Sequence, residues 1–227
     1  ACCRRADRVT CARPRPCLWL ISFTAERIDG ATMTVGKRAW QRMLSGRRLD
    51  LLDPSPLDIE MEDIAHGLAR VARWNGQTRG DAAFSVAQHS LLVDDIAGRL
   101  RPRLDAAGHL SAVLHDAAQF LSGDLTTPFK PAVRADYNAL EARLMAAIRL
   151  RFGLPAREPD DLTRLIKRAD RIAAYLEATQ LAGFSVTEAR RLFGHSKRFD
   201  DIALQPWPPA RAKRLFLERC VHLAKGL

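Results

Sequence analysis

The stretch Ser85-Val-Ala-Gln-His89-Ser-Leu-Leu-Val-Asp-Asp-Ile96 decides the fold class of this protein. Its apolar residues recur every three or four positions, which is the period of an α-helix with one buried face. Ser85 stands immediately before this pattern, where a serine side chain can accept a hydrogen bond from the first turn of a helix. His89 falls inside the apolar stripe rather than opposite it. The stretch is therefore predicted to be a helix that carries a histidine toward the core.

The helical period continues on both sides of this stretch. Glycine, asparagine and proline mark most of the predicted helix ends. Further helices are predicted from Ile59 to near Trp74, from Asp105 to Gly123, from Tyr137 to Phe152, from Pro159 to Leu181 and from Pro209 to Ala224. Only Thr32–Val35 and Arg48–Asp53 suggest strands, and both are short. The sequence therefore predicts an all-α domain.

Length and charge indicate how the chain is organised. The 227 residues are 47% apolar and 27% charged, which is enough apolar material to fill the core of one large domain. The net charge is +10, and residues 1–50 hold eleven Lys and Arg against four Asp and Glu. We expect residues 1–32 to be a disordered basic tail and Met33 to be the natural start. Residues 33–227 would then form the folded domain, with 59–185 as its core.

The same counts exclude several classes of protein. No apolar run near the start is long enough for a secretory signal or a membrane span, and no long repeat is visible. None of the five cysteines forms a Cys-x-x-Cys pair, which argues against a structural zinc site or a disulfide framework. A cytoplasmic protein without a membrane partner is expected. The basic excess lies in the tail and the domain has no recognised nucleic-acid motif, so nucleic acid is not the expected partner.

Three predicted helices carry histidine and aspartate side chains inside their apolar stripes. These residues are His89, His115, Asp116 and Asp170. A buried carboxylate is costly unless it is paired or bound to a metal ion. Two imidazoles and two carboxylates suit one divalent ion such as Mn²⁺, Co²⁺, Fe²⁺ or Zn²⁺. Each residue taken singly also fits a structural role, so it is their joint order on successive helices that indicates a metal site.

The chain resembles the HD-domain metal-dependent phosphohydrolases, and within them the bacterial 5′-deoxynucleotidases. The resemblance covers roughly residues 59–185. It rests on Arg73-Trp74, Phe84-Ser-Val-Ala-Gln-His89-Ser, Leu114-His115-Asp116-Ala, Gly123-Asp124-Leu-Thr-Thr-Pro128-Phe-Lys130 and Lys167-Arg-Ala-Asp170, the last followed by Ala174-Tyr175. It implies an HD-domain helical bundle with a metal site between helices, and the same four residues as metal ligands.

The resemblance also implies an activity, the release of phosphate from (deoxy)nucleoside 5′-monophosphates. Arg73 would clamp the phosphate, because a guanidinium binds phosphate bidentately, although it could instead end a helix. Trp74 would shape the sugar site or simply pack in the core. Asp124 would donate a proton to the leaving 5′-oxygen or cap a turn. Lys130 would offer the phosphate a second positive charge or face solvent.

One position departs from the family pattern. The family has Glu three residues after the aspartate of its His-Asp pair, and this chain has Gln119. On a continuous helix Gln119 would share the face of His115 and Asp116. A glutamate there can accept a proton from the attacking water, whereas an amide cannot.

The departure keeps other functions open. A metal- and nucleotide-binding HD module with little turnover is the alternative to a 5′-nucleotidase-like enzyme. A nucleic-acid-binding protein is a third reading, which rests on the basic tail. The native metal ion, the preferred base and sugar, and a homodimeric state are left open by the sequence.

Overall fold

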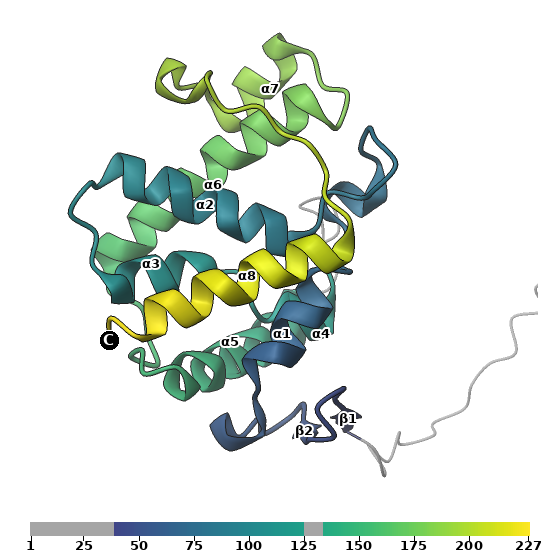
Figure 1. The fold of residues 1–227 in the computed structure, drawn as a ribbon, viewed down its shortest axis with the longest axis vertical. Coiled ribbons are helices and arrows are strands. Elements are labelled where there is room, and N and C mark those ends of the chain that lie inside the picture. The colour runs from purple at the N-terminus through teal and green to yellow at the C-terminus, as the bar shows by residue number, and fades with distance from the viewer. Residues whose placement is uncertain (1–38, 125–133) are drawn as a thin grey trace, which may run out of the picture. The chain divides into compact units, whose positions relative to one another are not determined.

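The structure, a computed structural model, describes residues 39–124 and 134–227 (Figure 1). Eight α-helices and one two-stranded antiparallel sheet make up this part of the chain. The all-α prediction is therefore confirmed. The predicted tail, Met33, the strand expected at Thr32–Val35 and Lys130 lie outside the described residues.

The predicted helices are found, some with other ends. The helices are α1 (Met61–Leu68), α2 (Val86–Leu100), α3 (Ala106–Val113), α4 (Gln119–Ser122), α5 (Arg134–Arg151), α6 (Asp160–Gln180), α7 (Val186–Phe193) and α8 (Pro209–Ala224). The strands β1 (Trp40–Arg42) and β2 (Arg48–Asp50) pair with Trp40 opposite Asp50. Neither β1 nor α7 is predicted from the sequence, since each is too short to show a clear period.

Local signals explain where two of the helices begin. The Ser85 hydroxyl accepts a hydrogen bond from the backbone N–H of Gln88 at 3.3 Å and caps α2. The Asp105 carboxylate accepts one from the backbone N–H of Gly108 at 2.8 Å and caps α3. Both caps agree with the sequence prediction, because capping depends only on residues within one helical turn.

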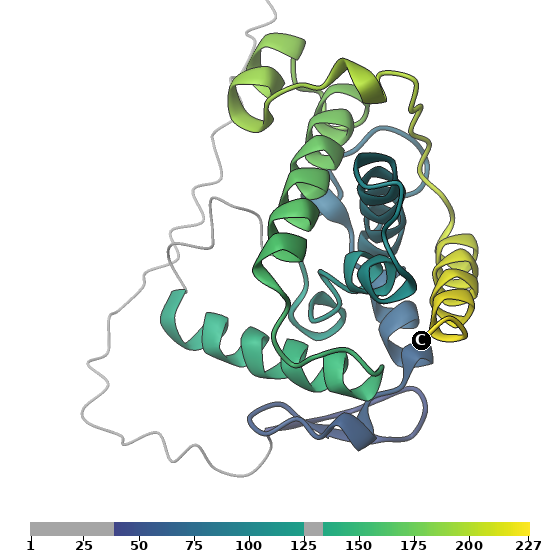
Figure 2. The same ribbon diagram turned by 90° about the vertical axis from the view of Figure 1, so that its left-hand side faces the viewer.

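Helix α2 is the central element of the packing. It contacts α6, α3 and α8, with α6 and α8 on opposite sides of it (Figure 2). One cluster of buried apolar side chains joins α1, α3, α5 and α8, and a second joins α2, α6 and α7. His89 of α2 is fully buried where α2 meets α6. The helix pair therefore positions this histidine.

The helix predicted over residues 105–123 is interrupted, so that prediction was wrong. Helix α3 ends at Val113, and residues 114–118 form a turn that leads into α4. The ring Nδ1–H of His115 donates to the carbonyl oxygen of Ala112 at 2.8 Å. In a continuous helix the same carbonyl oxygen would accept from the backbone N–H of Asp116. The His115 side chain competes for this acceptor. The His-Asp pair consequently lies in a tight turn.

The helix predicted to end near Trp74 already ends at Leu68. Residues 69–71 turn away from the helix, and Ala72 pairs with Ser85 in an isolated antiparallel β-bridge. A short 3₁₀ segment, η2 (Arg73–Gly76), follows this bridge. A long-range backbone contact has therefore replaced the last helical turns, which no local pattern could indicate.

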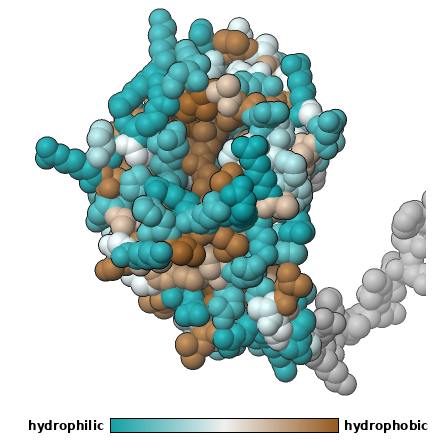
Figure 3. Space-filling model, in the orientation of Figure 1, coloured by the Kyte–Doolittle hydropathy of each residue, from teal (hydrophilic) through white to brown (hydrophobic). Residues whose placement is uncertain are grey.

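One face of the described part is mainly polar (Figure 3). Figure 3 shows mostly hydrophilic residues on one face, with hydrophobic residues gathered in a hollow in its upper middle. In the described ranges, no helix is long and apolar enough to cross a membrane.

The packing of α8 gives a stability prediction. Phe216 is fully buried in the first apolar cluster, whereas Val221 on the same helix is 52% exposed. Phe216→Ala should lower the free energy of unfolding by about 3 to 5 kcal/mol, because it removes buried surface and leaves a cavity. Val221→Ala should change it little. Urea unfolding followed by circular dichroism would measure both, and equal effects would contradict the packing described.

Candidate metal centre

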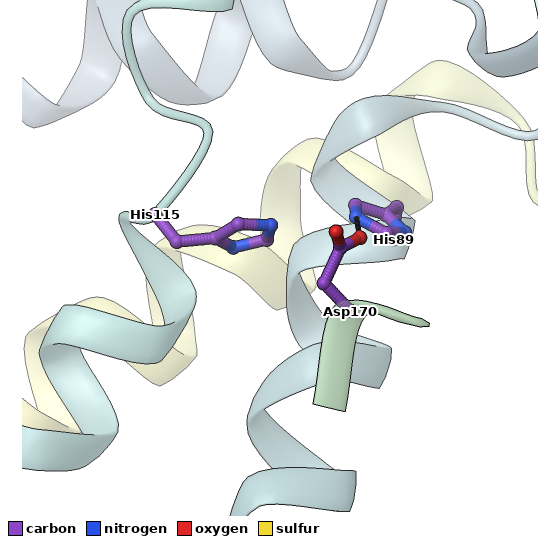
Figure 4. A group of neighbouring side chains, drawn as sticks. All are labelled: His89, His115 and Asp170. Atoms are coloured by element: carbon purple, nitrogen blue, oxygen red, sulfur yellow. Dashed lines mark ion pairs between the residues drawn. The ribbon is translucent and has the colours of Figure 1, made fainter. Parts of the chain in front are cut away.

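Side chains from three separate elements converge beside α2. His89 of α2, His115 of the turn after α3 and Asp170 of α6 each offer one ligand atom, and these atoms lie within 4.8 Å of one another (Figure 4). His89 Nε2 is 3.2 Å from Asp170 Oδ1. Asp116 Oδ2 lies 3.7 Å from His89 Nε2 and 3.5 Å from His115 Nε2. The structure thus brings the four predicted residues together.

The two imidazoles present suitable nitrogen atoms to this cluster. His89 Nδ1 is 2.5 Å from Glu177 Oε1, and His115 Nδ1 is 2.8 Å from the carbonyl oxygen of Ala112. Both Nδ1 atoms therefore act as donors, so Nε2 is the atom of each ring that can bind a metal ion once it carries no proton. Both Nε2 atoms are buried and make no hydrogen bond to a residue of the described ranges. This donor set fits a divalent metal ion, since metal-bound histidines are commonly oriented in this way.

Sequence reasoning missed Glu177, which has no exposed surface. Its carboxylate accepts hydrogen bonds from His89 Nδ1, from Trp74 Nε1 at 2.8 Å and from Arg73 Nε at 3.3 Å. It follows Asp170 by seven residues, which is about two helical turns, so both face the same side of α6. A glutamate at that spacing within an apolar stripe was the signal that could have identified it.

The charges around His89 favour a cation at the cluster. Burial and the charge of Arg73 act to lower the pKa of His89, but Glu177 and Asp170 outweigh them and raise it to about 9. Burial acts to raise the pKa of Asp170, yet its contact with His89 holds that pKa well below its usual range. Burial also acts to raise the pKa of Glu177, but the positive charge of Arg73, together with His89, outweighs it and lowers that pKa. The carboxylates are therefore ionised and stabilise positive charge between them.

Arg73 and Asp124, both predicted site residues, form an ion pair beside the cluster. Arg73 Nη1 is 3.2 Å from Asp124 Oδ2, and Arg73 Nε is 3.3 Å from Glu177 Oε2. These carboxylates raise the pKa of Arg73 although burial opposes them. The guanidinium is thus held in place by two carboxylates. Arg73 does not end α1, since that helix stops five residues before it.

Trp74 is both hydrogen-bonded and packed. Its indole N–H donates to Glu177, and its ring lies 5.5 Å from Phe184 and 5.9 Å from Phe193 between centroids. Trp74 and Asn75 have φ values of +56° and +51°, a left-handed conformation that is strained for residues with a side chain. The contacts of the Trp74 side chain hold this bend next to Arg73.

Gln119 is buried at the start of α4. Because α3 ends before His115, the prediction that Gln119 shares one continuous helix face with His115 and Asp116 was wrong. The turn nevertheless keeps Gln119 next to Asp116, because the backbone N–H of Gln119 donates to the carbonyl oxygen of Asp116 at 3.0 Å. Its side-chain oxygen has no hydrogen-bond partner within residues 39–124 and 134–227.

Comparison with known proteins gives one close and several distant relatives. The chain is 57% identical to an uncharacterized protein of Rhodobacter capsulatus, over 84% of this chain and 98% of that protein. It is 27% identical to a 5′-deoxynucleotidase of Vibrio cholerae, over 60% of this chain and 79% of that enzyme. It is also 34% identical to the uncharacterized protein YfdR of Escherichia coli, over 43% of this chain and 49% of that protein. No family model matches the chain.

The position of Glu177 gives a second stability prediction. Glu177→Gln should destabilise the metal-free protein by about 3 kcal/mol, the low end for a broken buried ion pair, because Arg73 keeps Asp124 as a partner. The matched control is Glu218→Gln on α8, where the carboxylate is 57% exposed in a surface ion pair. Its effect should be close to zero. Urea unfolding in the presence of EDTA would measure both, and similar losses in the two variants would refute a structural role for Glu177.

Proposed function

We propose that this chain, which belongs to one protein family with the uncharacterized Rhodobacter capsulatus protein, is a metal-dependent phosphohydrolase of the HD-domain superfamily. Its proposed reaction is the release of phosphate from (deoxy)nucleoside 5′-monophosphates. The observation that carries the proposal is the cluster of His89, His115 and Asp170, whose ligand atoms lie within 4.8 Å of one another. The distant similarity to 5′-deoxynucleotidases supports the substrate class.

The proposed metal ligands are His89, His115, Asp116 and Asp170. Two imidazole nitrogens and two carboxylates suit Mn²⁺, Co²⁺, Fe²⁺ or Zn²⁺. When bound, such an ion would supply positive charge for the phosphate oxygens and make water a better nucleophile.

Arg73 is the proposed phosphate clamp. A guanidinium has five N–H donors, so contacts with Glu177 and Asp124 leave it able to bind phosphate as well. A phosphate would compete with Asp124 for Arg73 and would bring negative charge close to that carboxyl. Both effects favour the protonated form of a carboxyl. Substrate binding would thus prepare Asp124 to donate a proton to the leaving 5′-oxygen, with Trp74 beside the sugar.

The metal assignment can be tested by direct titration. We expect one Mn²⁺ or Co²⁺ per chain in the unaltered protein and none in His115→Ala or Asp116→Ala, because each removes a ligand. Metal should also raise the thermal stability of the unaltered protein but not that of these two variants, since a ligand that binds the folded state stabilises it. His222→Ala, at an exposed position of α8, is the control and should bind metal normally. Full metal stoichiometry in both cluster variants would refute the assignment.

A second candidate function, a metal- and nucleotide-binding module with little turnover, is favoured by the buried amide of Gln119. Loss of a general base typically reduces the rate by about 10² to 10⁴. A phosphate-release screen over nucleoside mono-, di- and triphosphates with Mn²⁺, Co²⁺ and Mg²⁺ separates the two functions. Metal-dependent release from monophosphates supports the enzyme, and nucleotide binding without release supports the module.

Gln119→Glu tests the same point by restoring a carboxylate. We expect phosphate release to rise by about tenfold or more, because the new side chain can accept a proton from water. Repulsion of the substrate phosphate would reduce this gain. Gln77→Glu, which adds the same charge at an exposed position, is the control and should leave the rate unchanged. At equal metal occupancy, an unchanged or lower rate in Gln119→Glu would show that Gln119 does not replace a base.

A further inference from the structure

A groove between α6 and the loop after α7 is lined by positive charge. Arg164, Lys167, Arg168 and Arg171 come from α6, and His195 and Ser196 come from the loop. The groove has a volume of about 470 Å³, which is within the range of small-molecule sites. None of the described residues that line it carries a carboxylate. This basic groove does not include the proposed metal ligands.

The four cationic side chains of the basic groove lie on one stripe of α6. Residues three and four apart are neighbours on a helix, so Arg164 and Arg171 each stand beside both Lys167 and Arg168. All of these pairs are like-charged, and such pairs destabilise a helix.

The two carboxylates just before the stripe form ion pairs with other arginines. Asp161 of α6 pairs with Arg101 at 3.1 Å, and Asp160 pairs with Arg157 at 3.5 Å. Within the described ranges no ion pair involves any of the four cations of the groove. A bound anion would offset their mutual repulsion.

The opposite side of the basic groove is held in position by its own contacts. His195 Nε2 pairs with Asp200 Oδ1 at 2.9 Å, and the His195 ring lies against Tyr175 with centroids 4.8 Å apart. Gly194, with φ +78°, supplies the left-handed turn that brings the loop to this place. The ring of His195 is thus held in place at the groove, and Ser196 follows it in the same loop.

We propose that the basic groove binds a chain of phosphate groups, such as the polyphosphate of a nucleoside triphosphate. Guanidinium groups bind phosphate oxygens bidentately. The stripe from residue 164 to residue 171 rises by about 10.5 Å along the helix, so it can contact several phosphates in a row. Four cations within this length form a short track, which favours a short chain of phosphates over a nucleic-acid backbone.

Calorimetric titration of the full chain with inorganic tripolyphosphate in EDTA tests this site, independently of the proposed function. We expect one tripolyphosphate per chain, bound at least about tenfold more weakly by Arg164→Ala/Arg168→Ala, since two charge-assisted contacts are lost. The control Arg103→Ala/Arg143→Ala removes the same charge from exposed positions elsewhere and should bind like the unaltered protein. No binding, or equal weakening in both double variants, would overturn the proposal. Circular dichroism would verify that each variant is folded, which is expected because alanine favours helix.

Further titrations identify the source of the phosphates. A nucleoside triphosphate that binds more tightly than tripolyphosphate through Arg164 and Arg168 would make a nucleotide the ligand. Equal affinities would indicate inorganic polyphosphate, and either result supports the site. A single-stranded oligonucleotide that binds more tightly than both, through the same two arginines, would overturn the assignment in favour of a nucleic-acid surface.

Discussion

The candidate site depends on one fully buried carboxylate, that of Glu177. A buried carboxylate is tolerated only when donors satisfy it, and here a histidine, a tryptophan and an arginine do so. These donors come from α2 and from η2, while Glu177 itself belongs to α6. One group therefore orients the His89 ring, secures the strained turn at Trp74 and holds Arg73 beside the cluster. The orientation of His89 and the place of Arg73 beside the cluster follow from this network.

Sequence patterns predicted the features that depend on neighbouring residues. Ser85 and Asp105 cap the helices that follow them, and α8 begins and ends where the pattern and its prolines indicate. The patterns failed where a distant contact decides the structure. The His115 side chain competes for a backbone acceptor and ends α3, and a β-bridge replaces the end of the predicted helix before Trp74. Glu177 escaped notice because its partners lie about a hundred residues away in the chain.

The proposed metal binding and the proposed turnover depend on different residues. The cluster places carboxylate oxygens and imidazole nitrogens together without any contribution from Gln119. The amide changes only the capacity to accept a proton, so the fold can hold a metal ion whether or not the chain is a fast enzyme. The basic groove on the outer side of α6 adds a phosphate-binding surface whose chemistry depends on neither feature.

The central claim is that the cluster beside α2 binds a single divalent ion. Anomalous diffraction from crystals grown with Mn²⁺ tests it most directly. We expect one strong anomalous peak at about 2.0 to 2.3 Å from Nε2 of His89 and of His115, with Asp116 and Asp170 oxygens completing the coordination. A fully formed cluster without a peak, or a peak bound only by other residues, would contradict it.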